Sequence, residues 1–154
     1  MKAYLVGVSM SLLSVAALAG TCPDWRQNGE QRSFTSEDLY NKRTFNVTAG
    51  GSIRLSECDE VPGTGWVQEP PDLTLEFRNN AKKRMLRFKL VGEKGCDTAL
   101  LVNDTEADWQ YSDDDDGLNP VIRFPAAAAG TYDVWFASMD GKSCKARLEL
   151  ETFD

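Results

Sequence analysis

The segment "LTLEFRNNAKKRMLRFKL", from Leu73 to Leu90, decides the fold class. Apolar residues occupy every second position on both sides of a polar turn: Leu73, Leu75 and Phe77 before it, and Leu86, Phe88 and Leu90 after it. Side chains of a β-strand alternate between its two faces, so this period of two predicts strands with one buried and one hydrated face.

The same alternation recurs along the chain, and no helical period is found beyond residue 20. Short clusters of Gly, Pro, Asn and Asp separate the apolar runs, which is typical of turns between strands. We expect strands at 43–48, 52–56, 73–78, 85–91, 97–103, 108–112, 120–124, 131–138 and 145–152. Eight or nine short strands predict an all-β, antiparallel sandwich or barrel. The polar segment 21–38 is expected to be an arm or short helix packed onto it.

The first residues, "MKAYLVGVSMSLLSVAALAG", have the pattern of a signal peptide. Lys2 precedes an apolar run, and Ala17-Leu18-Ala19 matches an A-x-A cleavage site. The run is too short for a membrane span, and no later segment is apolar enough for one. The sequence therefore predicts a cleavable signal peptide at 1–19, an N-terminal arm at 20–42 and a β-sandwich domain at 43–154, in a periplasmic or secreted protein.

The chain is acidic, with a formal net charge of −7. All 24 acidic residues and 16 of the 17 basic residues lie beyond residue 19, so cleavage would change the net charge to −8. Nucleic acid and anionic membranes repel such a surface, which excludes them as expected partners. We expect an acidic monomer.

Four cysteines, Cys22, Cys58, Cys96 and Cys144, follow the predicted cleavage site. An even number in an exported chain predicts two disulfides, and three pairings are possible. We favour Cys22–Cys58, which would tie down the N-terminal arm, and Cys96–Cys144, which would join two loops near the last strands. Zinc is not favoured, because the chain has no CxxC spacing and no histidine.

Several motifs together resemble the bacterial pre-peptidase C-terminal domain family. They are "PPDLTLEF" (Pro70–Phe77), "CDTALLVND" (Cys96–Asp104), "WQYSDDDDGLNPVIRF" (Trp109–Phe124) and "AGTYDVWFASMDG" (Ala129–Gly141). The chain is also similar to small exported proteobacterial proteins that carry such a domain alone, although relatives often have a cysteine where this chain has Ser112. The resemblance implies a jelly-roll sandwich of the kind that accompanies secreted enzymes, in a family where some members bind calcium or an extracellular polymer. It does not imply catalysis.

The run of four aspartates is a candidate calcium site. Calcium is coordinated by six to eight oxygen atoms, which neighbouring carboxylates and amides can supply. The candidate ligands are Asp104, Asp113, Asp114, Asp115, Asp116 and Asn119. The alternative, which we favour, is a hydrated loop whose aspartates accept hydrogen bonds from backbone amides.

Tryptophans suggest a second kind of site, in which flat aromatic rings stack against a ligand. The candidates are Trp66, Trp109 and Trp135. Trp135 is out of phase with the core positions of its strand and is expected on the opposite face. There it is either exposed to a ligand or covered by a loop or the arm. The expected contact surface comprises this residue and the loops 59–71 and 112–119.

The residue types do not favour catalysis. Without histidine there is no Ser-His or Cys-His pair, and the cysteines are expected to be oxidised. We therefore predict a non-catalytic binding or accessory module without a certain cofactor, whose partner is a protein or polysaccharide of the cell envelope or exterior. One alternative is a periplasmic inhibitor or immunity-type protein directed against a basic secreted enzyme, because an acidic body is steered toward a cationic target. The other is a structural domain stabilised by calcium.

Overall fold

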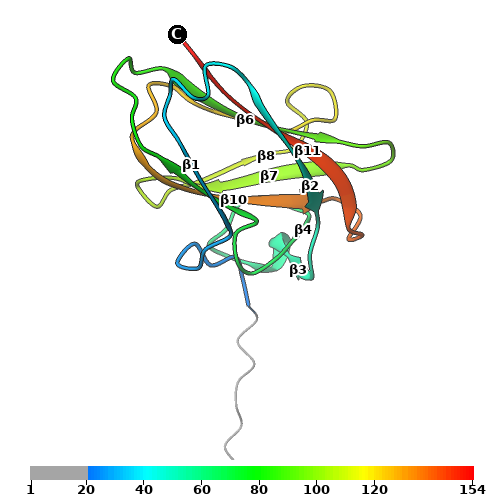
Figure 1. The fold of residues 1–154 in the computed structure, drawn as a ribbon. Coiled ribbons are helices and arrows are strands. Elements are labelled where there is room, and N and C mark those ends of the chain that lie inside the picture. Colours follow the sequence, from blue (N-terminus) through cyan, green and yellow to red (C-terminus); the bar gives the residue numbers. More distant parts are fainter. Residues whose placement is uncertain (1–20) are drawn as a thin grey trace, which may run out of the picture.

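The computed structural model describes residues 21–154, and the predicted signal peptide lies outside them. The described chain forms eleven strands in two sheets that pack face to face (Figure 1). Among these residues, no helix is long and apolar enough to cross a membrane. The all-β sandwich predicted from the sequence is confirmed.

The smaller sheet has four antiparallel strands. Their order is β2 (Arg43–Ala49), β11 (Cys144–Phe153), β6 (Met85–Gly92) and β9 (Val121–Phe124). Polar and apolar residues alternate on β6 and on much of β11, so that one face is buried against the other sheet and the other is hydrated.

The larger sheet is built on four antiparallel strands. Their order is β5 (Leu73–Phe77), β10 (Gly130–Ser138), β7 (Thr98–Asn103) and β8 (Trp109–Ser112). β1 (Glu30–Phe34) adds to the edge of β5 in parallel orientation. The two-residue strands β4 (Trp66–Val67) and β3 (Ile53–Arg54) extend the sheet beside the end of β10, and a 3₁₀ turn, Leu55–Glu57, follows β3.

The strand order is that of a jelly roll. If the eight longer strands other than β1 are numbered along the chain from one to eight, the sheets read 1-8-3-6 and 2-7-4-5. This is the arrangement of two Greek keys wrapped into a sandwich. The jelly-roll type implied by the resemblance is thus the topology of the structure.

Two separate apolar cores stabilise the fold. The main core lies between the sheets, where the ring of Tyr132 packs against Phe88 and Phe124 at centroid distances of 6.0 and 5.0 Å. Burial raises the pKa of Tyr132 to about 12, and its hydroxyl donates to the carbonyl of Ala128 at 2.9 Å. The second core lies on the outer face of the larger sheet, covered by the segment that contains β3 and β4.

Two disulfides join Cys22 to Cys58 and Cys96 to Cys144, which is the pairing favoured from the sequence. The first attaches the N-terminal segment to the cover of the second core. The second links the start of β7 to the start of β11, and therefore ties one sheet to the other.

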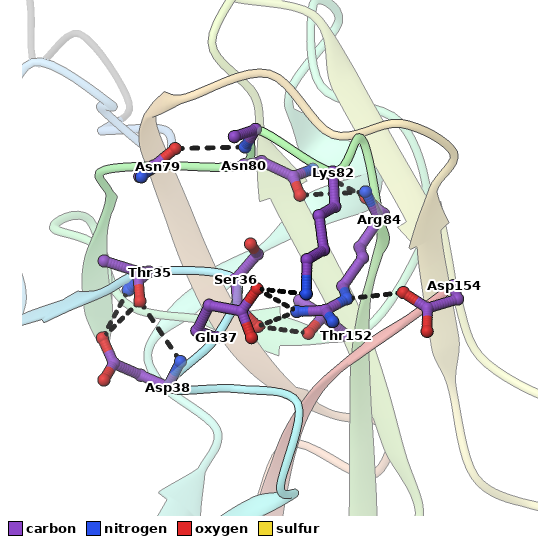
Figure 2. A network of polar contacts seen from close by, with 11 residues as sticks. Thr35, Ser36, Glu37, Asp38, Asn79, Asn80, Lys82, Arg84, Thr152 and Asp154 are labelled. Atoms are coloured by element: carbon purple, nitrogen blue, oxygen red, sulfur yellow. Dashed lines mark hydrogen bonds and ion pairs between the residues drawn. The ribbon is translucent and has the colours of Figure 1, made fainter.

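A buried arginine joins the turn between β1 and β2 to Asp154, which follows β11 (Figure 2). Arg84 is 4% exposed, and its guanidinium contacts Glu37 at 2.9 Å and Asp154 at 2.7 Å. The same group lies over the ring of Tyr40 at 4.2 Å. Because the guanidinium donates to both carboxylates, the pKa values of Glu37 and Asp154 are held below their usual range. This cluster is structural, since its charges are paired with one another.

All nine predicted strand positions contain a strand, although 52–56 is reduced to the two residues of β3 and the turn after it. The sequence did not predict β1 or β4. The segment 21–38, left open between an arm and a short helix, contains β1 and no helix.

Candidate functional site

The N-terminal segment 21–28 lies on the outer face of the larger sheet and borders a hollow on either side. Three connections hold it there. They are the Cys22–Cys58 disulfide, a hydrogen bond of 2.9 Å from the amide of Asp24 to the carbonyl of Glu69, and one of 2.9 Å from the side chain of Gln27 to the carboxylate of Glu69. The segment can therefore form a defined wall rather than a loose arm.

We call the larger hollow the acidic groove. It has a volume of about 700 Å³ and lies between the N-terminal segment and the loop 59–69. The charged and aromatic side chains on its walls are Asp24, Trp25, Arg26, Asp59, Glu60, Glu69 and Trp109, of which Arg26 is the one cation among the described residues of this lining. Part of the loop 59–71, expected from the sequence to form a contact surface, therefore lines this groove.

The carboxylates of the groove differ in how they are paired. Arg26 donates to Asp24 at 2.7 Å, which lowers the pKa of Asp24, and Gln27 donates to Glu69 at 2.9 Å. Asp59 and Glu60 are exposed, and within residues 21–154 neither forms an ion pair. Their negative charges are therefore free to attract a cationic group.

Trp25 is the exposed aromatic residue of the groove. It is 44% exposed, whereas the partly buried Trp109 on the opposite wall packs against Trp135 at a ring-centroid distance of 5.2 Å. Trp25 is not among the tryptophans predicted from the sequence to form a site. Its position three residues after Cys22 was the available signal, because a disulfide holds neighbouring residues in place.

Trp135 is buried, so it is not presented to a ligand at the surface of this structure. It lies on the outer face of its strand as expected but is 0% exposed, buried in the second core. Its indole donates to the carbonyl of Glu69 at 3.3 Å. The structure therefore has the alternative arrangement, in which a loop covers this residue.

Trp66 does not line the acidic groove. It lies in β4, partly buried, with the guanidinium of Arg54 5.8 Å from its ring centre. Gly141 packs closely against the ring, because a Cβ atom added at this glycine would lie 3.0 Å from the indole nitrogen. Of the three predicted tryptophans, the structure thus brings only Trp109 to the hollow beside the N-terminal segment.

The aspartate run contacts basic side chains of neighbouring strands. Asp115 pairs with Arg123 at 2.7 Å, and Asp116 pairs with Lys89, which lowers the pKa of Asp116. Asp113 accepts a hydrogen bond from the amide of Asp114 at 2.8 Å. These contacts are those of a hydrated loop that neutralises part of its own charge.

The remaining candidate calcium ligands form hydrogen bonds within the turns in which they lie. Asp104 accepts hydrogen bonds from the amides of Glu106 and Asp108 at 3.0 and 3.1 Å. Asn119 donates to the carbonyl of Asp116 at 3.1 Å. Between residues 21 and 154, no three acidic or cysteine side chains are arranged to hold a metal ion. Calcium binding therefore stays a prediction to be tested.

A further hollow, the mouth cleft, opens between the two sheets beside β1 and β2. It has a volume of about 490 Å³ and is lined by Glu30, Asp72 and Lys145 among others. Asp72 accepts a hydrogen bond of 2.7 Å from the amide of Phe136. Burial nevertheless raises the pKa of Asp72 to about 7, because desolvation disfavours its charged form. No sequence pattern singled out this residue.

Comparison with known proteins gives similarity at the level of structure. No family model matches the chain, and no curated protein matches its sequence. Among solved structures, it is similar to the pre-peptidase C-terminal domain of collagenase from Bacillus anthracis. The identity is 12% and the TM-score is 0.45, over 82% of this chain and 98% of that one. A similarity at this level has no bearing on ligands or activity, which are argued below from the chain's own residues.

Proposed function

We propose that the protein is an exported, non-catalytic binding module that holds a positively charged segment of a partner protein in the acidic groove. The observation that carries the proposal is that one hollow is lined both by the free carboxylates of Asp59 and Glu60 and by the exposed ring of Trp25. Lysine and arginine side chains bind to this combination through ion pairs and through stacking on the aromatic face.

Other features support the export and the lack of catalysis. Two disulfides are typical of proteins in oxidising compartments, and they occupy all four cysteines. The chain has no histidine to act as a general base near neutral pH. The net negative charge would speed association with a cationic partner.

A binding measurement with a model ligand tests this proposal. A fluorescein-labelled hexa-arginine peptide should bind the protein, and the affinity should fall as salt is added because the contacts are partly exposed. The double variant Asp59→Asn with Glu60→Gln should weaken binding about tenfold, and Trp25→Ala by a similar factor.

The control removes the same charge elsewhere. Asp114→Asn with Glu93→Gln alters two exposed carboxylates that do not line the acidic groove. This variant should bind almost as well as the original protein. Equal losses of affinity in the two double variants would show that only the net charge matters, and would contradict a role for the groove.

An inhibitor of a basic secreted enzyme is a second candidate that uses the same groove. It is favoured by the two free carboxylates, which can enter a cationic active site. Addition of the protein to a basic lysozyme distinguishes the two. Stoichiometric loss of the enzyme's activity would support the inhibitor, whereas binding without inhibition would support the module.

A further inference from the structure

A row of polar side chains crosses the outer face of the larger sheet, beyond the end of the second core. The strand register places Trp109 beside Asn103, Asn103 beside Asp133, and Asp133 beside Thr74. Residues directly opposite each other on one face of a sheet lie close enough for their side chains to interact. Four strands thus bring one aromatic and three polar side chains into a line.

The polar members of this row are buried but not fully paired. Asn103 is 2% exposed, and its Nδ2 atom has no hydrogen-bond partner within residues 21–154. Asp133 is 6% exposed, and its Oδ1 atom accepts a hydrogen bond of 2.6 Å from Thr74. Its Oδ2 atom accepts none from the described residues. A buried donor without a partner lowers stability, so its retention calls for an explanation.

This row lies beneath the second hollow beside the N-terminal segment, which we call the polar hollow. Its volume is about 490 Å³, within the range of small-molecule sites. Asn103 and Asp133 line it, as do Trp25, Asn28, Thr131 and Arg26, whose guanidinium is paired with Asp24. Asp104 also borders the hollow, but its Oδ1 atom is engaged by the amides of its own turn.

The chemistry of the hollow suits a neutral ligand with adjacent hydroxyl groups. Burial raises the pKa of Asp133, because desolvation disfavours its charged form. A hydroxyl donates to a free carboxyl oxygen, and a neighbouring hydroxyl accepts from an amide nitrogen. The exposed ring of Trp25 offers an apolar surface of the kind that packs against the C–H face of a pyranose.

We propose that the polar hollow binds a neutral pyranose sugar, with Asp133 and Asn103 bonding two adjacent hydroxyl groups and Trp25 packing against the ring. The site is distinct from the acidic groove, although Trp25 borders both hollows. The buried Nδ2 atom of Asn103 would have to turn toward the hollow to find its missing partner in a bound sugar. The inference does not depend on the proposed binding of a cationic segment.

Nuclear magnetic resonance of the intact protein tests this site. Methyl glucoside, methyl galactoside and methyl mannoside are titrated into the labelled protein, with cyclohexanol as a probe that lacks adjacent hydroxyls. At least one glycoside should shift the side-chain amide signals of Asn103 and the backbone signals of Asp133 and Thr131. If no glycoside at millimolar concentration shifts these signals, the proposal is wrong.

Variants separate a binding role from a structural one. Asn103→Leu and Asp133→Asn should each weaken glycoside binding about tenfold, the loss expected for one hydrogen bond. Ser138→Ala is the matched control, because the Ser138 hydroxyl is also buried and without a partner but does not line the hollow. It should leave binding unchanged. If Asn103→Leu does not fold, the affinity of the conservative variant Asp133→Asn decides whether the hollow binds the glycoside.

A final comparison keeps this proposal separate from the first. Asp59→Asn with Glu60→Gln should leave glycoside binding intact while it weakens binding of the hexa-arginine peptide. Glycoside binding that persists in both Asn103→Leu and Asp133→Asn would place the sugar elsewhere on the protein and overturn the assignment.

Discussion

Asp72 carries a carboxyl group that burial keeps neutral under mildly acidic conditions. Its raised pKa of about 7 arises because the mouth cleft provides one backbone donor, the amide of Phe136, to offset the loss of hydration. The acids that contact basic residues behave in the opposite way, since the pKa of Asp116 is lowered by Lys89. Asp72, like the buried Asp133, therefore links pH to stability with the opposite sign to the acids that are paired with basic residues.

The sign of this link follows from comparing the folded and unfolded states. An unfolded aspartate ionises near 3.8, whereas Asp72 in the folded protein ionises near 7. Asp72 makes its full contribution to the free energy of unfolding below about pH 4, and this contribution is lost as pH rises through about 7. Within this window it lowers the unfolding free energy by up to about 1.4 kcal/mol per pH unit.

The variant Asp72→Asn should remove this dependence, because the amide oxygen can still accept from Phe136 while no charge forms. Denaturant unfolding at about pH 5 and about pH 8 should show the variant gaining stability relative to the original protein as pH rises. Asp114→Asn, at an exposed position, should not change the slope. A variant at Asp72 with an unchanged slope would contradict the assignment.

At the scale of single elements, alternation of apolar residues predicted the long strands, and its limits explain what was missed. β1 has the sequence EQRSF, with one large apolar residue, and is a strand because its backbone pairs with β5. β4 has only two residues, too few for any period. Alternation also placed Trp135 on the outer face correctly. It does not distinguish a hydrated face from one covered by another segment.

The two disulfides should have separable effects, because they lie in different places. Cys22→Ala with Cys58→Ala should lower the unfolding free energy by about 2–4 kcal/mol and also free the N-terminal wall of the acidic groove. Binding of the hexa-arginine peptide should then be lost.

Cys96→Ala with Cys144→Ala is the comparison. It should cost a similar amount of stability but leave peptide binding in place, since neither residue lines the groove. Chemical denaturation and fluorescence anisotropy measure the two quantities. If both double variants retain full binding, the wall does not depend on its covalent attachment.

At the scale of the whole molecule, the sequence predicted a sandwich, whereas the strand order came from a resemblance. Most paired strands lie far apart in the chain, as β2 and β11 do, and no local pattern specifies such partners. For the same reason the polar row of Asn103 and Asp133 could not be predicted, because it depends on the register of β7 against β10. Of the candidate sites, the loop 59–71 and Trp109 were anticipated, and Trp25 was not.

Thermal melts test the calcium hypothesis for the molecule as a whole. Asp115 and Asp116 already pair with Arg123 and Lys89, so we expect the same Tm in millimolar calcium and in chelator. Any ion that binds the folded state alone must raise the Tm. A rise of several degrees with calcium, absent with magnesium, would show that the loop rearranges to take the ion.

The strand order also constrains when this chain can fold. In the smaller sheet β2 pairs with β11, so Arg43 lies opposite Leu150, about a hundred residues further along the chain. That layer cannot close until the residues of β11 have emerged from the ribosome. Its hydrophobic strands remain open to wrong partners until then, and contacts of such long range form slowly. Release of the segment that contains β11, rather than the synthesis of any earlier strand, therefore sets the moment at which the sandwich can form.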